Sequence, residues 1–212
     1  MRFLGITAAS VLFCASLQAQ VVISVPTGAN TGDDGNTGQS FTPSINTSGS
    51  FTGSSAFLTQ FTFVVSPNAS ISTPPAFLLI FSNFSGGTAT GLLQASINSQ
   101  TWSAIGANNT ATFNFAGDVA LDINTTYFAI FSDSQTAFVH NGARIGRGIL
   151  FDGDVYSGGA LFHDGSIQPG LDARFTATFS TSPVPEPSTW AMFAGGLATL
   201  GLVGWRRRAA RR

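Results

Sequence analysis

The fold is constrained most by short segments in which apolar and polar residues alternate along the chain. Between residues 57 and 65, every second position forms one mostly apolar face (Phe57, Thr59, Phe61, Phe63, Val65), and the other face carries Leu58, Gln60, Thr62 and Val64. This period of two predicts a β-strand with one face toward a core. Residues 77–84 are apolar until Ser82-Asn83, which predicts a strand that is covered on both faces.

Further strands are expected along the rest of the chain, at 92–97, 111–115, 126–132, 137–140, 148–151, 160–162 and 174–179. Turn-forming pairs such as Gly86-Gly87 and Asp152-Gly153 separate them. Roughly ten short strands without an amphipathic helix between them predict an all-β fold, an antiparallel β-sandwich of the jelly-roll type. The 20 phenylalanines would supply most of its core.

A long uncharged stretch sets the C-terminal part of the chain apart. The 19 residues from Pro187 to Trp205 carry no charge, and as a helix they would span roughly 28 Å, close to the thickness of a bilayer core. Five arginines follow (Arg206, Arg207, Arg208, Arg211, Arg212), and such a cluster beside a spanning helix stays in the cytoplasm. We therefore expect a transmembrane helix over 188–205 and a cytoplasmic stop over 206–212. A permanent anchor that is never processed is the alternative that these residues leave open.

The motif before this stretch makes the tail more specific. Val184-Pro185-Glu186-Pro187, the apolar span and the final arginines together resemble the PEP-CTERM sorting signal of Gram-negative bacteria. The resemblance implies that an exosortase, a multi-pass membrane enzyme, recognises Pro185, Glu186 and Pro187. It also implies that the tail is removed as the protein moves to the cell surface or the exopolysaccharide layer. The chain would then be the substrate of this reaction, held in the membrane at least transiently.

The N-terminus is predicted to be a secretory signal peptide. Arg2 precedes an apolar run over 3–17, and the small residue Ala19 predicts cleavage between Ala19 and Gln20 after export through the Sec machinery. A lipoprotein signal at Cys14 is disfavoured because Phe13 stands where a small residue is expected. The chain thus divides into a signal peptide (1–19), an exported β-sandwich domain (20–182) and a sorting tail (183–212 with its motif at 184–187).

The charge of the exported domain excludes some partners. Residues 20–182 contain nine aspartates but only three arginines and no lysine, so the domain carries a charge of about −6. Nucleic acids and anionic lipids are bound by clustered positive charge, which this domain lacks. Its polarity comes mainly from Ser, Thr, Asn and Gln, which suits a hydrated, glycan-rich matrix.

The sequence offers little for catalysis or for a cofactor. The only histidines are His140 and His163, and the exported domain has no glutamate, so neither a hydrolytic triad nor a carboxylate pair of the glycosidase type is indicated. We expect no enzymatic activity and no cofactor. Calcium is the one metal weighed, because oxygen ligands gather in two loops (Asp33, Asp34, Asp152, Asp154). The Asp-Gly pairs in these loops are primarily typical of turns, which is the favoured interpretation.

Two classes of function remain open for the exported domain. The favoured class is a non-catalytic protein of the cell envelope or extracellular matrix. The alternative is a carbohydrate-binding module that contacts extracellular polysaccharide through exposed aromatic rings, for which the candidates are Trp102, Tyr127 and Tyr156. The segments 38–43, 121–130 and 171–175 also weakly resemble the choice-of-anchor β-sandwich domains that often precede such tails, which have no established activity.

Overall fold

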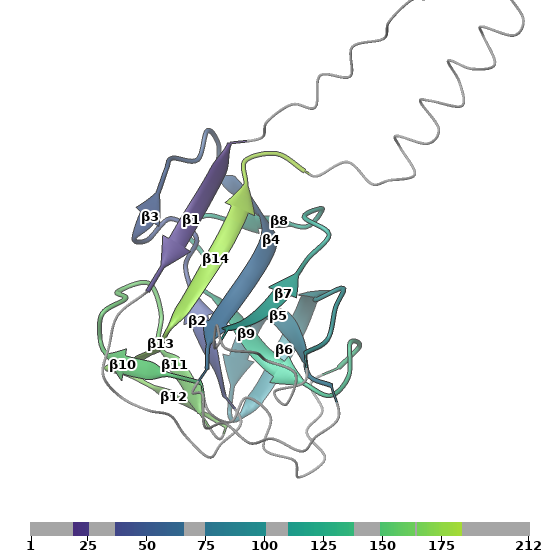
Figure 1. Cartoon of the computed structure of the whole chain (residues 1–212), viewed down its shortest axis with the longest axis vertical. Helices are drawn as coiled ribbons and strands as arrows, with labels where there is room; N and C mark the ends of the chain where they lie inside the picture. The colour runs from purple at the N-terminus through teal and green to yellow at the C-terminus, as the bar shows by residue number, and fades with distance from the viewer. Residues whose placement is uncertain are drawn as a thin grey trace, which may run out of the picture.

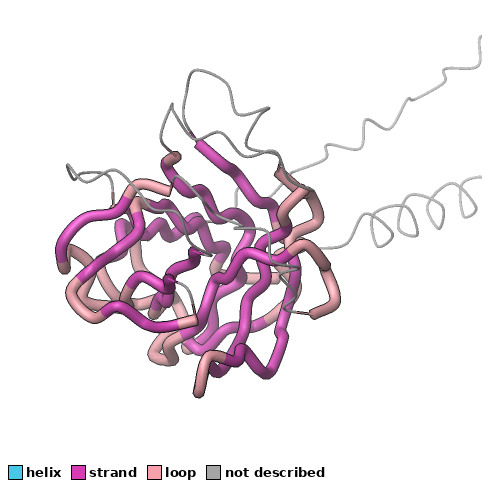
Figure 2. Tube along the Cα trace, turned by 90° about the horizontal axis from the view of Figure 1, so that it is seen from below, coloured by secondary structure: helices cyan, strands magenta, loops and turns pink. Residues whose placement is uncertain are grey.

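A computed structural model describes residues 19–25, 37–65, 75–100, 110–137, 149–163 and 165–183. All regular secondary structure in these ranges is β, with no helix among them (Figure 2). The strands are β1 (Gln20–Ser24), β2 (Thr37–Phe41), β3 (Thr47–Ser48), β4 (Ser55–Val64), β5 (Phe77–Ser85), β6 (Thr88–Ala95), β7 (Thr110–Asn114), β8 (Ala120–Asp122), β9 (Tyr127–Ser132), β10 (Phe151–Gly153), β11 (Leu161–His163), β12 (Ser166–Gln168), β13 (Leu171–Ala173) and β14 (Phe175–Ser180).

These strands form two layers with antiparallel pairing throughout (Figure 1). One sheet has the order β3-β1-β14-β4-β7, with β8 also paired to β4, and the other has the order β12-β11-β2-β9-β5-β6; β10 and β13 form a separate two-stranded sheet. The chain passes repeatedly between the sheets: β1 lies in the first and β2 in the second, then β4 in the first, β5 and β6 in the second, β7 in the first, β9 in the second and β14 in the first. This alternation is that of a jelly roll, so the predicted fold class is confirmed.

Phenylalanine fills the space between the two sheets, as expected. Phe61 stacks on Phe175 with ring centroids 5.0 Å apart and an interplanar angle of 12°, and it lies 4.8 Å from Phe63. Phe63 in turn contacts Phe131 of the opposite sheet at 4.9 Å. These rings belong to one continuous core that both sheets contribute to, and each of them is fully or almost fully buried.

The alternation in β4 is interrupted by a β-bulge, which corrects part of the expected pattern. Thr178 of β14 pairs with Gln60, but the next residue pairs with Leu58, so Thr59 is an extra residue in β4. Because one extra residue reverses which side chains face inward, Leu58 is fully buried in the main core and Thr59 is only half-buried. The prediction that Thr59 and Phe57 share the core face of Phe61 is therefore wrong, whereas the inward placement beyond the bulge, from Phe61 to Val65, is confirmed.

Strand β5 is covered on both faces, as its continuous apolar sequence predicted. Leu78 and Ile80 point into the main core, whereas Leu79 and Phe81 belong to a second cluster on the other face of the sheet. The turn after β5 is also confirmed: Gly86 and Gly87 have φ values of 58° and 77°, which glycine adopts without strain.

Several other expectations were met only in part. Strands β6, β7, β9, β11 and β14 lie close to their predicted positions, but β1, β2, β3, β8, β12 and β13 were not predicted as strands. The predicted turn at Asp152-Gly153 is wrong, because both residues lie in β10 and pair with β13. The strand expected at 137–140 lies, apart from Ala137, outside the described residues.

Across the described residues, no helix is long and apolar enough to cross a membrane. The expected span at 188–205 and the arginine cluster at 206–212 lie outside these residues, as does the signal peptide before Ala19.

Candidate functional site

A buried carboxylate is the most unusual polar group of the sandwich. Asp172 in β13 is fully buried, and its Oδ2 accepts hydrogen bonds from the backbone N–H groups of Val155 and Tyr156 at 2.9 and 2.8 Å. Its Oδ1 accepts a hydrogen bond from Nε2 of Gln39 in β2 at 3.0 Å, and Oε1 of Gln39 accepts the N–H of Ala173 at 2.7 Å. The carboxylate therefore ties β2, β13 and the turn after β10 together.

Tyr156 extends this network to Thr42, the residue directly after β2. Its hydroxyl donates to the carbonyl of Thr42 at 2.8 Å and accepts the N–H of the same residue at 3.0 Å. Oγ1 of Thr42 donates to the carbonyl of Gly158 at 2.9 Å, and the Ser40 hydroxyl donates to the carbonyl of Ala160 and accepts its N–H. The segment 153–173 is thus fastened along β2 by side chains as well as by backbone pairing.

Burial governs the ionisation of these groups. It raises the pKa of the Asp172 carboxyl above its ordinary value, although the hydrogen bonds from Tyr156, Gln39 and Val155 act in the opposite direction. Burial likewise raises the pKa of the Tyr156 and Tyr127 hydroxyls, so both phenols are neutral at physiological pH. A neutral, fully hydrogen-bonded phenol is a structural group.

The interpretation of Tyr127 and Tyr156 as surface platforms for sugars is wrong. The exposed fraction is 5% for Tyr127 and 0% for Tyr156, so neither ring is available to stack on a ligand. The hydroxyl of Tyr127 accepts the N–H of Asp122 at 2.7 Å, and both rings pack in the main core. Burial of these two rings adds more to the stability of this cysteine-free domain than their exposure on the surface would. Trp102, the third candidate, lies outside the described residues.

The candidate calcium ligands are only partly described. Asp152 lies in β10 directly opposite Asp172, and its Oδ1 accepts the N–H of Gly153 at 2.9 Å. Asp154 is the first residue after β10, whereas Asp33 and Asp34 lie outside the described residues. Among the residues that the structure covers, no group of three or more His, Cys, Asp or Glu side chains is placed to hold a metal ion. Calcium binding stays a prediction.

The two ends of the exported domain meet at one end of the sandwich. Gln20, the first residue after the expected cleavage, begins β1 and pairs with Ser180, the last residue of β14 (Figure 1). Ala19 directly precedes this pair and is exposed. The expected cleavage point and the start of the tail therefore lie side by side on neighbouring strands.

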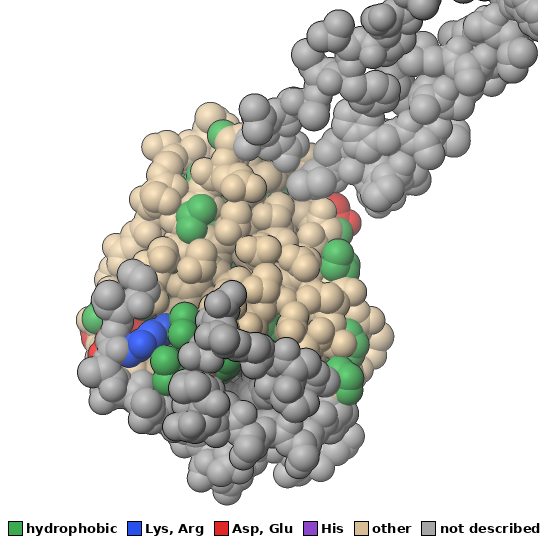
Figure 3. All heavy atoms as spheres, in the orientation of Figure 1, with side chains coloured by type: hydrophobic (Ala, Val, Ile, Leu, Met, Phe, Trp, Pro, Cys, Tyr) green, Lys and Arg blue, Asp and Glu red, His purple; other side chains and the backbone are tan. Residues whose placement is uncertain are grey.

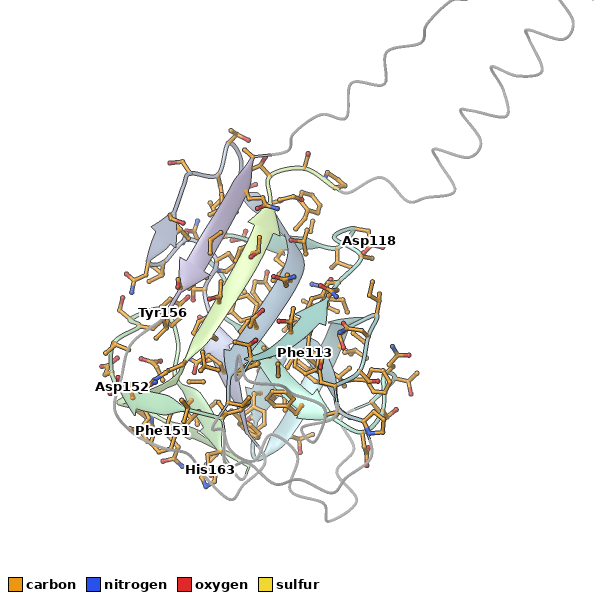
Figure 4. The ribbon with its side chains drawn as sticks, viewed as in Figure 1. Phe113, Asp118, Phe151, Asp152, Tyr156 and His163 are labelled. Atoms are coloured by element: carbon orange, nitrogen blue, oxygen red, sulfur yellow. The ribbon has the colours of Figure 1, made fainter. Side chains whose placement is uncertain are left out.

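Sequence reasoning missed the network around Asp172. Gln39 and Asp172 are 133 residues apart in sequence, and nothing in either local pattern pairs them. The only local signal was an acidic residue between the apolar residues Leu171 and Ala173, a position where a strand would bury it. His163 lies in β11 at the far end of the sandwich (Figure 4), and His140 lies outside the described residues.

Comparison with known proteins identifies the tail. The family model for the PEP-CTERM protein-sorting motif matches residues 183–208, which include Pro185, Glu186 and Pro187. No curated protein and no solved structure gives a significant match to the chain. The motif implies an exported protein that an exosortase processes and that is attached transiently to the membrane. The chain thus carries a PEP-CTERM sorting motif, which begins in the sequence three residues after Ser180, the last residue of β14.

Proposed function

We propose that residues 20–182 form a non-catalytic structural module of the cell surface or the extracellular matrix. The observation that carries this proposal is the use of buried polar side chains within the described residues. Each of them forms hydrogen bonds that hold strands and turns together (Gln39, Ser40, Thr42, Ser96, Ser132, Asp172, Ser180). Polar groups that are committed in this way stabilise a fold, which supports a structural role.

The described surface also suits a hydrated matrix. Over β1, β14 and β4 it consists mainly of uncharged polar side chains and backbone (Figure 3). Across the outer face of this sheet, Thr62 and Thr112 share a hydrogen bond of 3.1 Å, and Nε2 of Gln60 donates to Oδ1 of Asn114 at 3.2 Å. Such a face stays hydrated without attracting anionic or cationic polymers by charge.

The structural role is tested in the native host. Cells without the gene are complemented with the wild-type protein or with His163→Ala, which removes the described histidine. We expect both proteins to co-fractionate with the matrix equally and to restore its cohesion equally. Turnover of a matrix component that is lost with His163→Ala, while the melting temperature is unchanged, would show that the module is an enzyme.

The alternative is a carbohydrate-binding module that contacts a neutral polysaccharide. The row of hydroxyl and amide groups on the outer face of β4 and β7 favours it, since such groups match sugar hydroxyls. With Tyr127 and Tyr156 buried, Trp102 is the remaining aromatic candidate. A glycan array with the mature protein and its Trp102→Ala variant separates the two functions: a ligand that is bound by the wild type and lost in the variant would favour the alternative.

A further inference from the structure

The folded sandwich continues to within a few residues of the sorting motif. Strand β14 ends at Ser180, and the match to the motif begins at Pro183. The Oγ atom of Ser180 donates to the carbonyl of Ser182 at 2.5 Å, a local bond at the start of the exposed segment Ser182-Pro183. The six residue-to-residue steps from Ser180 to Glu186 reach at most about 22 Å when fully extended. An enzyme acting on the motif must therefore work close to the folded domain.

Residues of β14 cannot detach from the sheet to lengthen the segment that precedes the motif. The strand lies in the interior of its sheet, where Ser180 is paired with Gln20 of β1 on one side and with Phe57 of β4 on the other. The preceding residue, Phe179, is fully buried, and its ring centroid lies 6.1 Å from that of Phe41 and 6.0 Å from that of Phe51. Releasing two residues from β14 would break pairing on both sides and remove an aromatic ring from the core.

Among the residues that the structure describes, two hairpins lie at the opposite end of the sandwich. The β5–β6 and β11–β12 hairpins meet there, since a Cβ atom built on Gly87 would lie 3.6 Å from the carbonyl oxygen of Gly165 (Figure 1). This end is separated from Ser180 by the length of the strands. A tail that is anchored in the membrane and that starts at the end of β14 leaves the hairpins pointing away from the membrane.

We propose that the end of the sandwich that carries Gln20 and Ser180 is the surface that meets the membrane-embedded exosortase. The fixed end of β14 sets the spacing that lets the enzyme reach the motif while the domain stays folded. This inference rests on the sorting motif and not on the structural role proposed above, because it holds for any folded module at this position.

The spacing is tested by shortening it without touching the motif. Deletion of Thr181 and Ser182 removes about 7 Å of reach. The matched control, Thr181→Gly with Ser182→Gly, keeps the length and changes the sequence, and a third variant inserts Gly-Ser-Gly-Ser after Ser182. Each full-length protein is expressed in the native host, and the fraction that has lost its tail is measured by mass spectrometry, with the melting temperature as a check on folding.

We expect the deletion to lower the processed fraction at least about tenfold, because the shortened segment holds the motif short of the enzyme's reactive site. Misplacement of a reacting group by only about 1 Å can cost about 100-fold in rate. The control and the insertion should be processed like the wild type. Equal processing of the deletion variant, with an unchanged melting temperature, would overturn the proposal. Loss of processing in the glycine control would also overturn it, because the enzyme would then read the sequence of the spacer. A wild-type protein that keeps its tail would refute the sorting account itself.

The orientation is tested with single cysteines, because Cys14 of the signal peptide is the only cysteine in the chain. Ser50→Cys lies next to Gly49, which packs near Gln20, and Ser166→Cys lies in the far hairpin; both positions are exposed. In a host without exosortase, a bulky, membrane-impermeant maleimide should label Ser166→Cys several-fold faster than Ser50→Cys. The two rates should be similar in the purified, tail-free protein. A ratio that is the same in both settings would show that the end near Gln20 does not face the membrane.

Discussion

Substitution of Tyr156 by phenylalanine tests whether the buried polar network holds the sandwich together. The substitution keeps the ring but removes the hydroxyl, which donates to the carbonyl of Thr42 and accepts its N–H. The carbonyl also accepts the N–H of Ile45 at 3.1 Å, so only the amide of Thr42 is left without its partner. Thr42 is 8% exposed, and water has little access to this amide.

A buried donor without a partner costs about 1–3 kcal/mol, and the lost hydrogen bond from the hydroxyl adds about 1 kcal/mol. We therefore expect Tyr156→Phe to lower the free energy of unfolding by about 2–4 kcal/mol. For a domain of this length, that corresponds to a fall in melting temperature of roughly 4–16 °C. Urea unfolding of the purified mature protein, followed by far-UV circular dichroism, measures the change directly.

Tyr127→Phe is the matched control. It also removes a buried hydroxyl, but this hydroxyl accepts the N–H of Asp122, which lies near the surface where water can replace the lost partner. We expect a loss below about 1 kcal/mol. A loss of less than about 0.5 kcal/mol for Tyr156→Phe, or equal losses for both variants, would refute the reasoning that the network around Asp172 and Tyr156 anchors the fold.

Three further predictions concern the core, a close backbone contact and the dependence on pH. Phe61→Ala should lower the free energy of unfolding by about 3–5 kcal/mol in denaturant titrations, since its fully buried ring packs between both sheets; a loss below about 1 kcal/mol would contradict this packing. Gly38→Ala should prevent stable folding, because the new Cβ would lie 2.4 Å from the carbonyl oxygen of Ala129, whereas Gly53→Ala meets nothing within 4 Å and should melt like the wild type. The raised pKa of Asp172 means that the folded protein holds the carboxyl proton more tightly than the unfolded chain does. The protonated carboxyl therefore stabilises the fold below the ordinary pKa of 3.8, and this contribution is lost as the pH rises through the raised pKa. The loss should be absent from the stability profile of Asp172→Asn against pH, and an identical pH dependence in both proteins would contradict the prediction.

The sequence predicted the type of fold because its signals were local. Alternation over 174–179 and the apolar run over 77–81 each placed a strand and its faces correctly, and glycines marked the turn at Gly86. Two packed sheets are the arrangement that covers the apolar faces of so many regularly spaced strands, so the pattern predicted a sandwich.

What the sequence did not predict depended on pairing between distant segments. The bulge at Thr59 is defined only by the register between β4 and β14, and no local pattern reveals it. Strand β1 was missed because its short apolar core, from Val21 to Ile23, closely follows the expected signal peptide and offers little alternation. The burial of Tyr127 and Tyr156 follows from contacts with Asp122 and Thr42, which become neighbours only in the folded sandwich.

The sorting tail was found from its sequence for a different reason. Its signal is a linear order of motif, apolar span and arginines, which is read by an enzyme and a bilayer and does not require the sandwich to be folded. Only the structure shows that Ser180 lies next to Gln20 and that the last strand ends a few residues before the motif.

The most direct test of the account is the mass of the mature protein isolated from its native host. If the chain is exported and sorted as its motif implies, the protein begins at Gln20 and lacks Trp205 and the terminal arginines. A mature protein that still ends in Arg211-Arg212 would contradict the account, because the tail would then be a permanent anchor and not a signal that is removed.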